Sequence, residues 1–170
     1  MLFQGYAPLF SGATTAPALA SPRRSAKGDG VARPGGDVAV LNEHRIDVRV
    51  YYEDTDLAGI VYYANYLKFI ERARSEWIRT LGLDQTRLKE DQGIVFAVRR
   101  LEADYLSPAR FDDVLSVHTS TESMSGARIT LRQEVRRAGE PLFVAVVTLV
   151  ALTETGQPTR LPADLRLRMH

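Results

Sequence analysis

The hydrophobic and polar positions change their repeat along the chain and predict a strand followed by a long helix. Residues 46–52 alternate apolar and polar side chains, which is typical of a strand with one buried face. From Tyr63 to Leu81 apolar residues instead recur at three- and four-residue steps, with charged residues on the opposite face. Gly82 then tolerates the left-handed conformation that is common just past a helix end. The pattern predicts a helix over 62–81, the only long helix of the chain.

Four later segments show the patterns of strands. They cover residues 94–106, 114–121, 128–136 and 143–152. The last is an almost continuous apolar run, which is typical of a central strand covered on both faces. The turn sequences Ser125-Gly126 and Gly139-Glu140-Pro141 separate the last three segments and predict consecutive hairpins. One strand, one long helix and four more strands indicate an α+β domain.

Composition limits the classes of protein to which the chain can belong. Its 170 residues, with 45% hydrophobic content, suffice for one well-formed core, which we place in residues 42–170. The 22 Lys and Arg residues nearly cancel the 21 Asp and Glu residues, so no strong field recruits nucleic acid. The chain has no cysteine, which excludes disulfides, thiolate metal sites and cysteine nucleophiles. No run approaches the roughly 18 apolar residues of a transmembrane segment, and we expect a soluble, cytoplasmic protein.

Residues 1–41 differ from the rest of the chain. They are rich in Gly, Ala, Pro and Ser, and no helical or strand repeat persists among them. We therefore expect a flexible N-terminal extension outside the folded domain. Its basic residues, Arg23, Arg24 and Lys27, leave a targeting segment open as an alternative. Residues 2–5 also resemble the remnant of a protease site used in cloning.

Candidate chemistry gathers in residues 51–66, where an acidic turn leads directly into the predicted helix. A carboxylate beside the free N–H groups of a helix N-terminus offers a base or nucleophile, together with a place for a developing oxyanion. Acyl transfer needs both of these parts. Taken alone, Asp56 would be interpreted as a turn residue or a helix cap, because Asp is favoured at both.

Two longer motifs resemble a known family. The first runs from Tyr52 to Tyr66, YEDTDLAGIVYYANY, and is followed by FIERAR at 69–74; the second is YLSPARFDD at 105–113. Together they resemble the 4-hydroxybenzoyl-CoA thioesterase branch of the hotdog family, and within it the Tol–Pal-associated acyl-CoA thioesterases. The likeness covers about residues 42–162. It implies the hotdog fold, a five- or six-stranded antiparallel sheet wrapped around one long central helix, and hydrolysis of an acyl-CoA to a free carboxylic acid and CoA.

The resemblance also implies roles for individual residues. It places the catalytic carboxylate on Asp56, which would attack the thioester carbonyl or activate a water molecule. The backbone N–H of Tyr63 would bind the thioester oxygen. Substrate contacts are implied at Gly59, Val61, Tyr62 and Glu71. For Glu71 the alternative is an exposed helix charge. Many Tol–Pal-associated relatives carry His where this chain has Tyr63, so a step that needs an imidazole there is absent from this chain.

Partners follow from the same resemblance. The expected substrate is acyl-CoA, with an acyl carrier protein thioester as a further possible donor, and no metal or other cofactor is required. The CoA phosphates need cations, for which Arg128, Arg99 and Arg100 are candidates, although arginines on strand faces are usually solvated. A homodimer with its active sites at the interface, or a homotetramer, is expected.

Rival functions are less well supported by the sequence. A hotdog dehydratase needs a His near the helix start, and none lies between residues 56 and 66. A serine hydrolase is disfavoured because no Gly-x-Ser-x-Gly elbow occurs. The alternative to an enzyme is a non-catalytic acyl-CoA-binding or envelope-linked interaction module that keeps the pocket. The intact Asp56 and Gly59 favour the enzyme.

Overall fold

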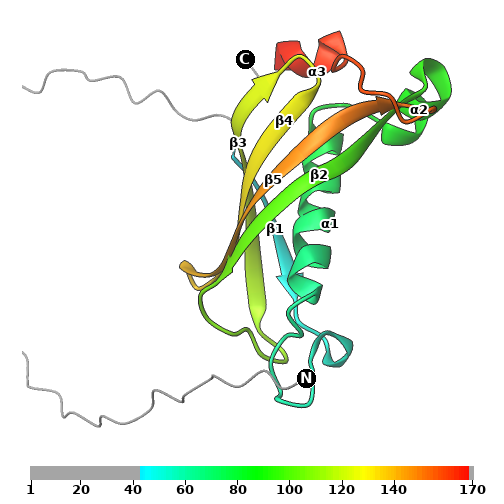
Figure 1. Cartoon of the computed structure of the whole chain (residues 1–170). Coiled ribbons are helices and arrows are strands. Elements are labelled where there is room, and N and C mark those ends of the chain that lie inside the picture. Colours follow the sequence, from blue (N-terminus) through cyan, green and yellow to red (C-terminus); the bar gives the residue numbers. More distant parts are fainter. Residues whose placement is uncertain (1–42, 169–170) are drawn as a thin grey trace, which may run out of the picture. The chain divides into compact units, whose positions relative to one another are not determined.

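The computed structural model describes residues 43–168, which form one antiparallel sheet with a long helix along one face (Figure 1). The strands lie in the order β1-β3-β4-β5-β2, and every neighbouring pair is antiparallel. The elements are β1 (Glu43–Arg49), α1 (Asn65–Thr80), β2 (Ile94–Tyr105), β3 (Val114–Ser125), β4 (Arg128–Arg137) and β5 (Glu140–Thr153). The predicted α+β hotdog fold is confirmed, with five strands in this part of the chain. The predicted extension, residues 1–41, lies outside the described residues.

The core lies between α1 and the inner face of the sheet. Apolar side chains of α1 that recur at helical spacing are buried: Tyr66, Phe69, Ile70, Ala73, Trp77 and Ile78. Alternate residues of β3 and β4 face them, because successive strand residues point to opposite sides. On β5 the inward residues are buried, whereas the outward Val144, Val146 and Thr148 are half-buried. The outer face of β5 is therefore only partly covered, which differs from the expected full cover on both faces.

Helix α1 begins at Asn65, three residues later than the predicted start. The backbone just before Asn65 forms hydrogen bonds outside the helix. The Tyr62 N–H donates to the Asp54 carbonyl (2.9 Å), and the Asn65 N–H donates to the Tyr62 carbonyl (2.8 Å) in a turn. Tyr63 consequently lies outside the helix and is 60% exposed. Its position in the apolar repeat is accidental, and the prediction that it belongs to the buried face is wrong.

Strand β1 also ends earlier than predicted, at Arg49 rather than residue 52. The Asp54 carboxylate accepts a hydrogen bond from the Tyr51 N–H (2.9 Å), which turns the chain into a short 3₁₀ helix, η1 (Tyr52–Asp54). Tyr51 and Tyr52 are exposed as a result. Asp54 itself is buried, so it stabilises the turn and is not a solvated charge.

Two short helices had no signal in the hydrophobic pattern. Helix α2 (Gln85–Gln92) buries only Leu88, and it is set up by its ends: the Asp84 carboxylate caps it, and Gly93 closes it at φ +63°. Helix α3 (Ala163–Arg168) has six residues. Of the helices in the described residues, none is long and apolar enough to cross a membrane.

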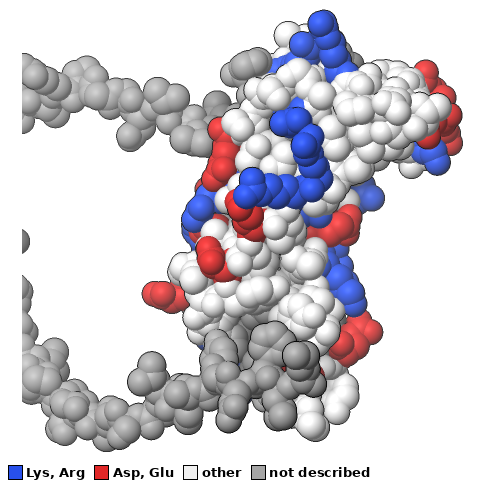
Figure 2. Space-filling model, in the orientation of Figure 1, with Lys and Arg blue, Asp and Glu red and all other residues white. Residues whose placement is uncertain are grey.

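Charged residues of both signs are interspersed on the face of the molecule shown in Figure 2. On the sheet, ion pairs such as Arg45–Asp47 and Arg136–Glu134 bring opposite charges together. Among residues 43–168, no three His, Cys, Asp or Glu side chains are grouped so that they could hold a metal ion.

Candidate active site

Asp56 begins a tight loop between η1 and α1. Its backbone N–H donates to the Ile60 carbonyl (3.0 Å), its carbonyl accepts from the Gly59 N–H (2.9 Å), and its Oδ1 accepts from the Ala58 N–H (2.8 Å). Gly59 has φ +73°, which a residue with a side chain rarely adopts. These three hydrogen bonds hold Asp56 in the turn at the surface, where its second carboxylate oxygen makes no bond within the described residues. The carboxylate is therefore held in place and still accessible.

The start of α1 lacks the usual side-chain cap. The N-cap residue is Ala64, which has no capping side chain, and the first turn contains no acidic residue. Within residues 43–168, the backbone N–H groups of Tyr63 and Ala64 donate to no protein acceptor. Such N–H groups, together with the helix dipole, favour a negative charge on a bound ligand. The sequence motif points to the Tyr63 N–H but not to that of Ala64, because the Ala64 N–H is recognised as unbonded only once the helix start is known.

The buried backbone carbonyl of Asp54 and the buried side chain of Asn65 fix this helix start relative to the Asp56 loop. The Asp54 carbonyl accepts from the Tyr62 N–H and also from the Asn65 side-chain amide (3.0 Å). Both Asp54 and Asn65 are buried, so the geometry is protected from water. The acidic turn and the helix N-terminus are thereby held as one unit.

A second segment, 105–110, holds the same unit from the side of β2. The Tyr105 hydroxyl donates to the Tyr63 carbonyl (3.1 Å), and the Ala109 N–H donates to the Tyr66 hydroxyl (2.9 Å). The Val61 N–H donates in turn to the Ala109 carbonyl (2.9 Å). Burial, and then the neighbouring Tyr63, raise the pKa of Tyr105, so its hydroxyl stays protonated and remains a donor. The YLSPARFDD motif had been recognised only as part of a resemblance, and the structure shows this physical role for it.

Asp113 anchors this second segment to the sheet. Its Oδ2 accepts from the Arg110 N–H (2.8 Å) and from the Arg137 guanidinium (2.7 Å). Burial alone would raise the pKa of Asp113, but these hydrogen bonds and the positive charges of Arg137 and Arg110 outweigh it and lower the pKa. The carboxylate is therefore ionised at neutral pH and keeps both bonds.

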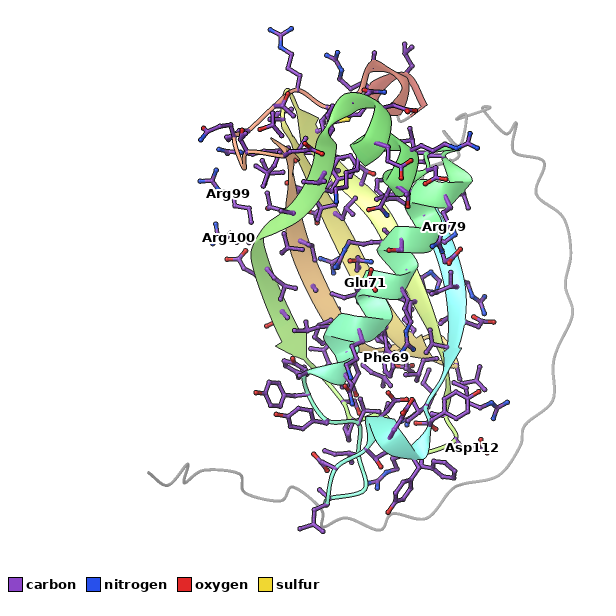
Figure 3. The ribbon with its side chains drawn as sticks, turned by 90° about the vertical axis from the view of Figure 1, so that its right-hand side faces the viewer. Phe69, Glu71, Arg79, Arg99, Arg100 and Asp112 are labelled. Carbon is purple, nitrogen blue, oxygen red and sulfur yellow. The ribbon has the colours of Figure 1, made fainter. Side chains whose placement is uncertain are left out.

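The predicted site residues do not all lie together in a single chain. Asp56, Gly59, Tyr62 and the Tyr63 N–H gather at the entry to α1, where Asp56, Leu57, Ala58 and Tyr62 line a shallow surface depression. Val61 is buried, so its side chain belongs to the core. Glu71 lies farther along α1 (Figure 3). Its side chain is exposed and accepts a hydrogen bond from the Ser75 hydroxyl (2.8 Å).

The candidate phosphate-binding arginines are remote from this loop in one chain. Arg128 starts β4, whereas Arg137 at the other end of β4 bonds to Asp113 near the Asp56 loop. A strand of this length spans about 30 Å. Arg99 and Arg100 project from the free edge of β2 (Figure 3), and Arg100 forms an ion pair with Glu102. A single chain therefore does not bring these three cations to Asp56.

The chain belongs to the Thioesterase superfamily, whose sequence profile matches residues 58–144. A protein of Haemophilus influenzae named acyl-CoA thioesterase YbgC is 41% identical over 131 residues, which are 76% of this chain and 96% of that protein. The resemblance derived from the two motifs is thus confirmed.

Solved structures agree with this assignment. A "Probable Thioesterase" from Bartonella henselae has 37% sequence identity and a TM-score of 0.67, and the match covers 71% of this chain and 99% of that one. A 4-hydroxybenzoyl-CoA thioesterase complexed with 4-hydroxybenzoyl-CoA has a TM-score of 0.72 at 23% identity, covering 76% and 100%. At that identity the second structure supports the fold alone.

Proposed function

We propose that this protein hydrolyses an acyl-CoA thioester to a free carboxylic acid and CoA. The observation that supports this most strongly is the uncapped start of α1: unbonded N–H groups lie in the same rigid unit as the accessible carboxylate of Asp56. A carboxylate and an oxyanion site suffice for thioester hydrolysis, without a metal. The relatives named as acyl-CoA thioesterases point to the same substrate class.

Asp56 has two routes open to it. As a nucleophile it adds to the thioester carbonyl, the C–S bond breaks, and the CoA thiolate takes up a proton; water then hydrolyses the resulting anhydride. As a general base it accepts a proton from a water molecule whose oxygen adds to the carbonyl directly, with loss of the same thiolate. In both routes the carbonyl oxygen gains negative charge, which the Tyr63 N–H stabilises by hydrogen bonding. Tyr63 acts here through its backbone, so the lack of an imidazole does not interrupt either route.

The unit that carries out this reaction is proposed to be a homodimer, or a homotetramer built from dimers. Among the described residues β2 pairs with β5 alone, and it spans 12 residues and exposes Val98 at 49%, which makes it an edge suited to pairing with a second copy. Antiparallel pairing of two β2 strands about Leu101 would set Arg100 of one copy opposite Glu102 of the other. It would also bring the far end of one sheet beside the Asp56 loop of the other, where Arg128 could reach CoA phosphates.

An acyl-CoA substrate implies a cytoplasmic site of action, and an acyl carrier protein thioester is a second possible donor. The alternative function is an acyl-CoA-binding or envelope-linked module without turnover. It differs from the enzyme in rate alone, since both need the pocket.

The test is CoA release, followed with a thiol reagent, from a panel of short-chain, long-chain and aromatic acyl-CoAs and one acyl carrier protein thioester. Turnover that exceeds spontaneous hydrolysis supports the enzyme and identifies its donor. Tight acyl-CoA binding with no release on any donor would refute the enzyme and support the binding module.

A further inference from the structure

The core contains a cation that no carboxylate of the described chain neutralises. Arg74 faces the sheet from α1 and retains only 9% exposure. Its one hydrogen bond within residues 43–168 runs from Nη1 to the Gln133 Oε1 (2.8 Å), and no ion pair involves it there. Burial of an unpaired charge is costly, so natural proteins normally provide it with an anionic partner. Its position, four residues after Ile70 and three before Trp77, lies on the apolar stripe of the helix.

Gln133 holds the guanidinium in one orientation. Its Nε2 donates to the Ile70 carbonyl (2.9 Å) and to the Thr119 hydroxyl (2.8 Å), which leaves Oε1 free to face Arg74. Gln133 and Thr119 are fully buried. The arrangement fixes Arg74 without using more than one of its five N–H donors.

The remaining N–H groups of Arg74 find no acceptor in the sheet. Beyond Gln133, the same cross-strand row continues with Ala145 on β5 and Ala103 on β2, which supply only methyl groups. These nitrogens are nevertheless not fully enclosed. Among the described residues, the side-chain atoms that are both fully enclosed and without a hydrogen-bond partner belong to His44 and Thr121, not to Arg74. The guanidinium thus keeps a small contact with solvent.

The carboxylate of Glu71, whose charge acts on Arg74, does not take this place. Burial lowers the pKa of Arg74, and the charge of Glu71 opposes that shift, but the two side chains form no ion pair. Glu71 is exposed and accepts its hydrogen bond from Ser75. Among the described residues, no carboxylate therefore pairs with Arg74.

Arg74 lies farther along α1 than the proposed oxyanion site. Helical side chains point toward the helix N-terminus, and the Gln133 amide that holds Arg74 also bonds to Ile70. Ile70 lies seven residues after Tyr63, roughly 10 Å along the helix at 1.5 Å per residue. That separation suits a ring-containing or medium-length acyl group whose carbonyl lies at the Tyr63 N–H.

We propose that Arg74 forms an acyl-recognition subsite that binds an oxygen at the distal end of the acyl group, a carboxylate or a hydroxyl. The proposal rests on the thioesterase function proposed above. The other source of a neutralising anion is a carboxylate of a second copy. The variants below distinguish that source, because loss of a contact between copies would weaken the oligomer and would affect both analogues alike.

Binding of two matched ketone analogues tests the subsite without turnover. In each analogue a methylene separates the CoA sulfur from the carbonyl, so neither can be hydrolysed; one carries an adipoyl group with a terminal carboxylate and the other a hexanoyl group. Charge-assisted hydrogen bonds contribute about 1.5–3 kcal/mol, so wild type should bind the adipoyl analogue about 10- to 150-fold more tightly. Arg74→Gln should abolish this preference, and Arg74→Lys should keep part of it. Arg72→Gln, at an exposed position of the same helix, should keep all of it.

Three results would overturn the subsite: no adipoyl preference in wild type, a preference that survives Arg74→Gln, or an equal loss of affinity for both analogues. The last would assign Arg74 to packing, or to a carboxylate of a second copy if the oligomer also dissociates. If Arg74→Gln does not fold, the wild-type preference and its reduction in Arg74→Lys decide the question. Binding with the expected preference but no release of CoA from any thioester would support the subsite and refute the thioesterase.

Discussion

Tyr105 offers a way to disturb the proposed oxyanion site without touching the substrate. Its hydroxyl donates to the Tyr63 carbonyl at 3.1 Å, and its ring lies against Tyr66 and Phe143. Tyr105→Phe keeps the ring and removes only the hydrogen bond. The peptide groups around Tyr63 then lose their link to β2, while Asp54 and Asn65 still hold the loop from the other side.

The structure sets the size of the expected effect. Tyr105 is 48% exposed, so the lost hydrogen bond should cost no more than about 1 kcal/mol of unfolding free energy. A well-placed oxyanion donor contributes about 3–4 kcal/mol to the transition state. If the loosened peptide forfeits about a third of this, kcat should fall about five- to tenfold, whereas KM should stay within about twofold because Tyr105 itself binds no substrate.

The assay is steady-state CoA release on the best donor, with thermal unfolding measured in parallel. Tyr52→Phe is the matched control, because Tyr52 is 83% exposed and its hydroxyl makes no hydrogen bond within the described residues. An unchanged kcat in a Tyr105→Phe protein, or an equal fall in both variants, would refute the positioning role of the Tyr105 hydroxyl.

Three further predictions concern the turn, the anchor and the assembly. Gly59→Ala should lose about 1–2 kcal/mol through the positive φ alone, since no atom lies within 4 Å of the added methyl; a loss above about 3 kcal/mol in denaturant unfolding would contradict this. The pKa of Asp113 is lowered in the folded state, so its contribution to the free energy of unfolding is present above its ordinary pKa of 3.8 and should be lost as the pH falls through the folded pKa. Arg137→Met should reduce this loss of stability in acid. An unchanged acid dependence in the variant would exclude the Asp113–Arg137 pair as its cause. Arg100→Glu and Glu102→Arg should each weaken the dimer in sedimentation, and the double exchange should restore it; independent effects would rule out pairing about Leu101.

Local patterns were sufficient to predict the sheet. The strands β2 to β5 were predicted to within a few residues, because alternation and turn residues such as Gly126 and Gly139 act over short distances. The predicted end of β1 and the predicted start of α1 were wrong because hydrogen bonds of Asp54, which the hydrophobic pattern does not contain, set both. Asp54 turns the chain after β1, and its carbonyl bonds to Tyr62 just before α1.

The site was predictable only in part, for a similar reason. Asp56, Gly59 and the Tyr63 N–H came from a contiguous motif, and they do lie together in the structure. The contributions of Tyr105 and Arg74 depend on contacts between residues 42 and 59 positions apart, which no local pattern contains. Their polar atoms meet partners on other elements only after the chain has folded.

The most direct test of the central claim is kcat for CoA release by Asp56→Asn, with Glu53→Gln, an exposed neighbour in η1, as the control. Asparagine preserves the size of the side chain and its Oδ1 acceptor for the Ala58 N–H, so the loop should fold normally. We predict that kcat falls by about 10²-fold or more in Asp56→Asn, the scale of a principal catalytic group, while Glu53→Gln stays within about twofold. A folded Asp56→Asn protein that retains wild-type kcat would contradict the assignment of Asp56 as nucleophile or base.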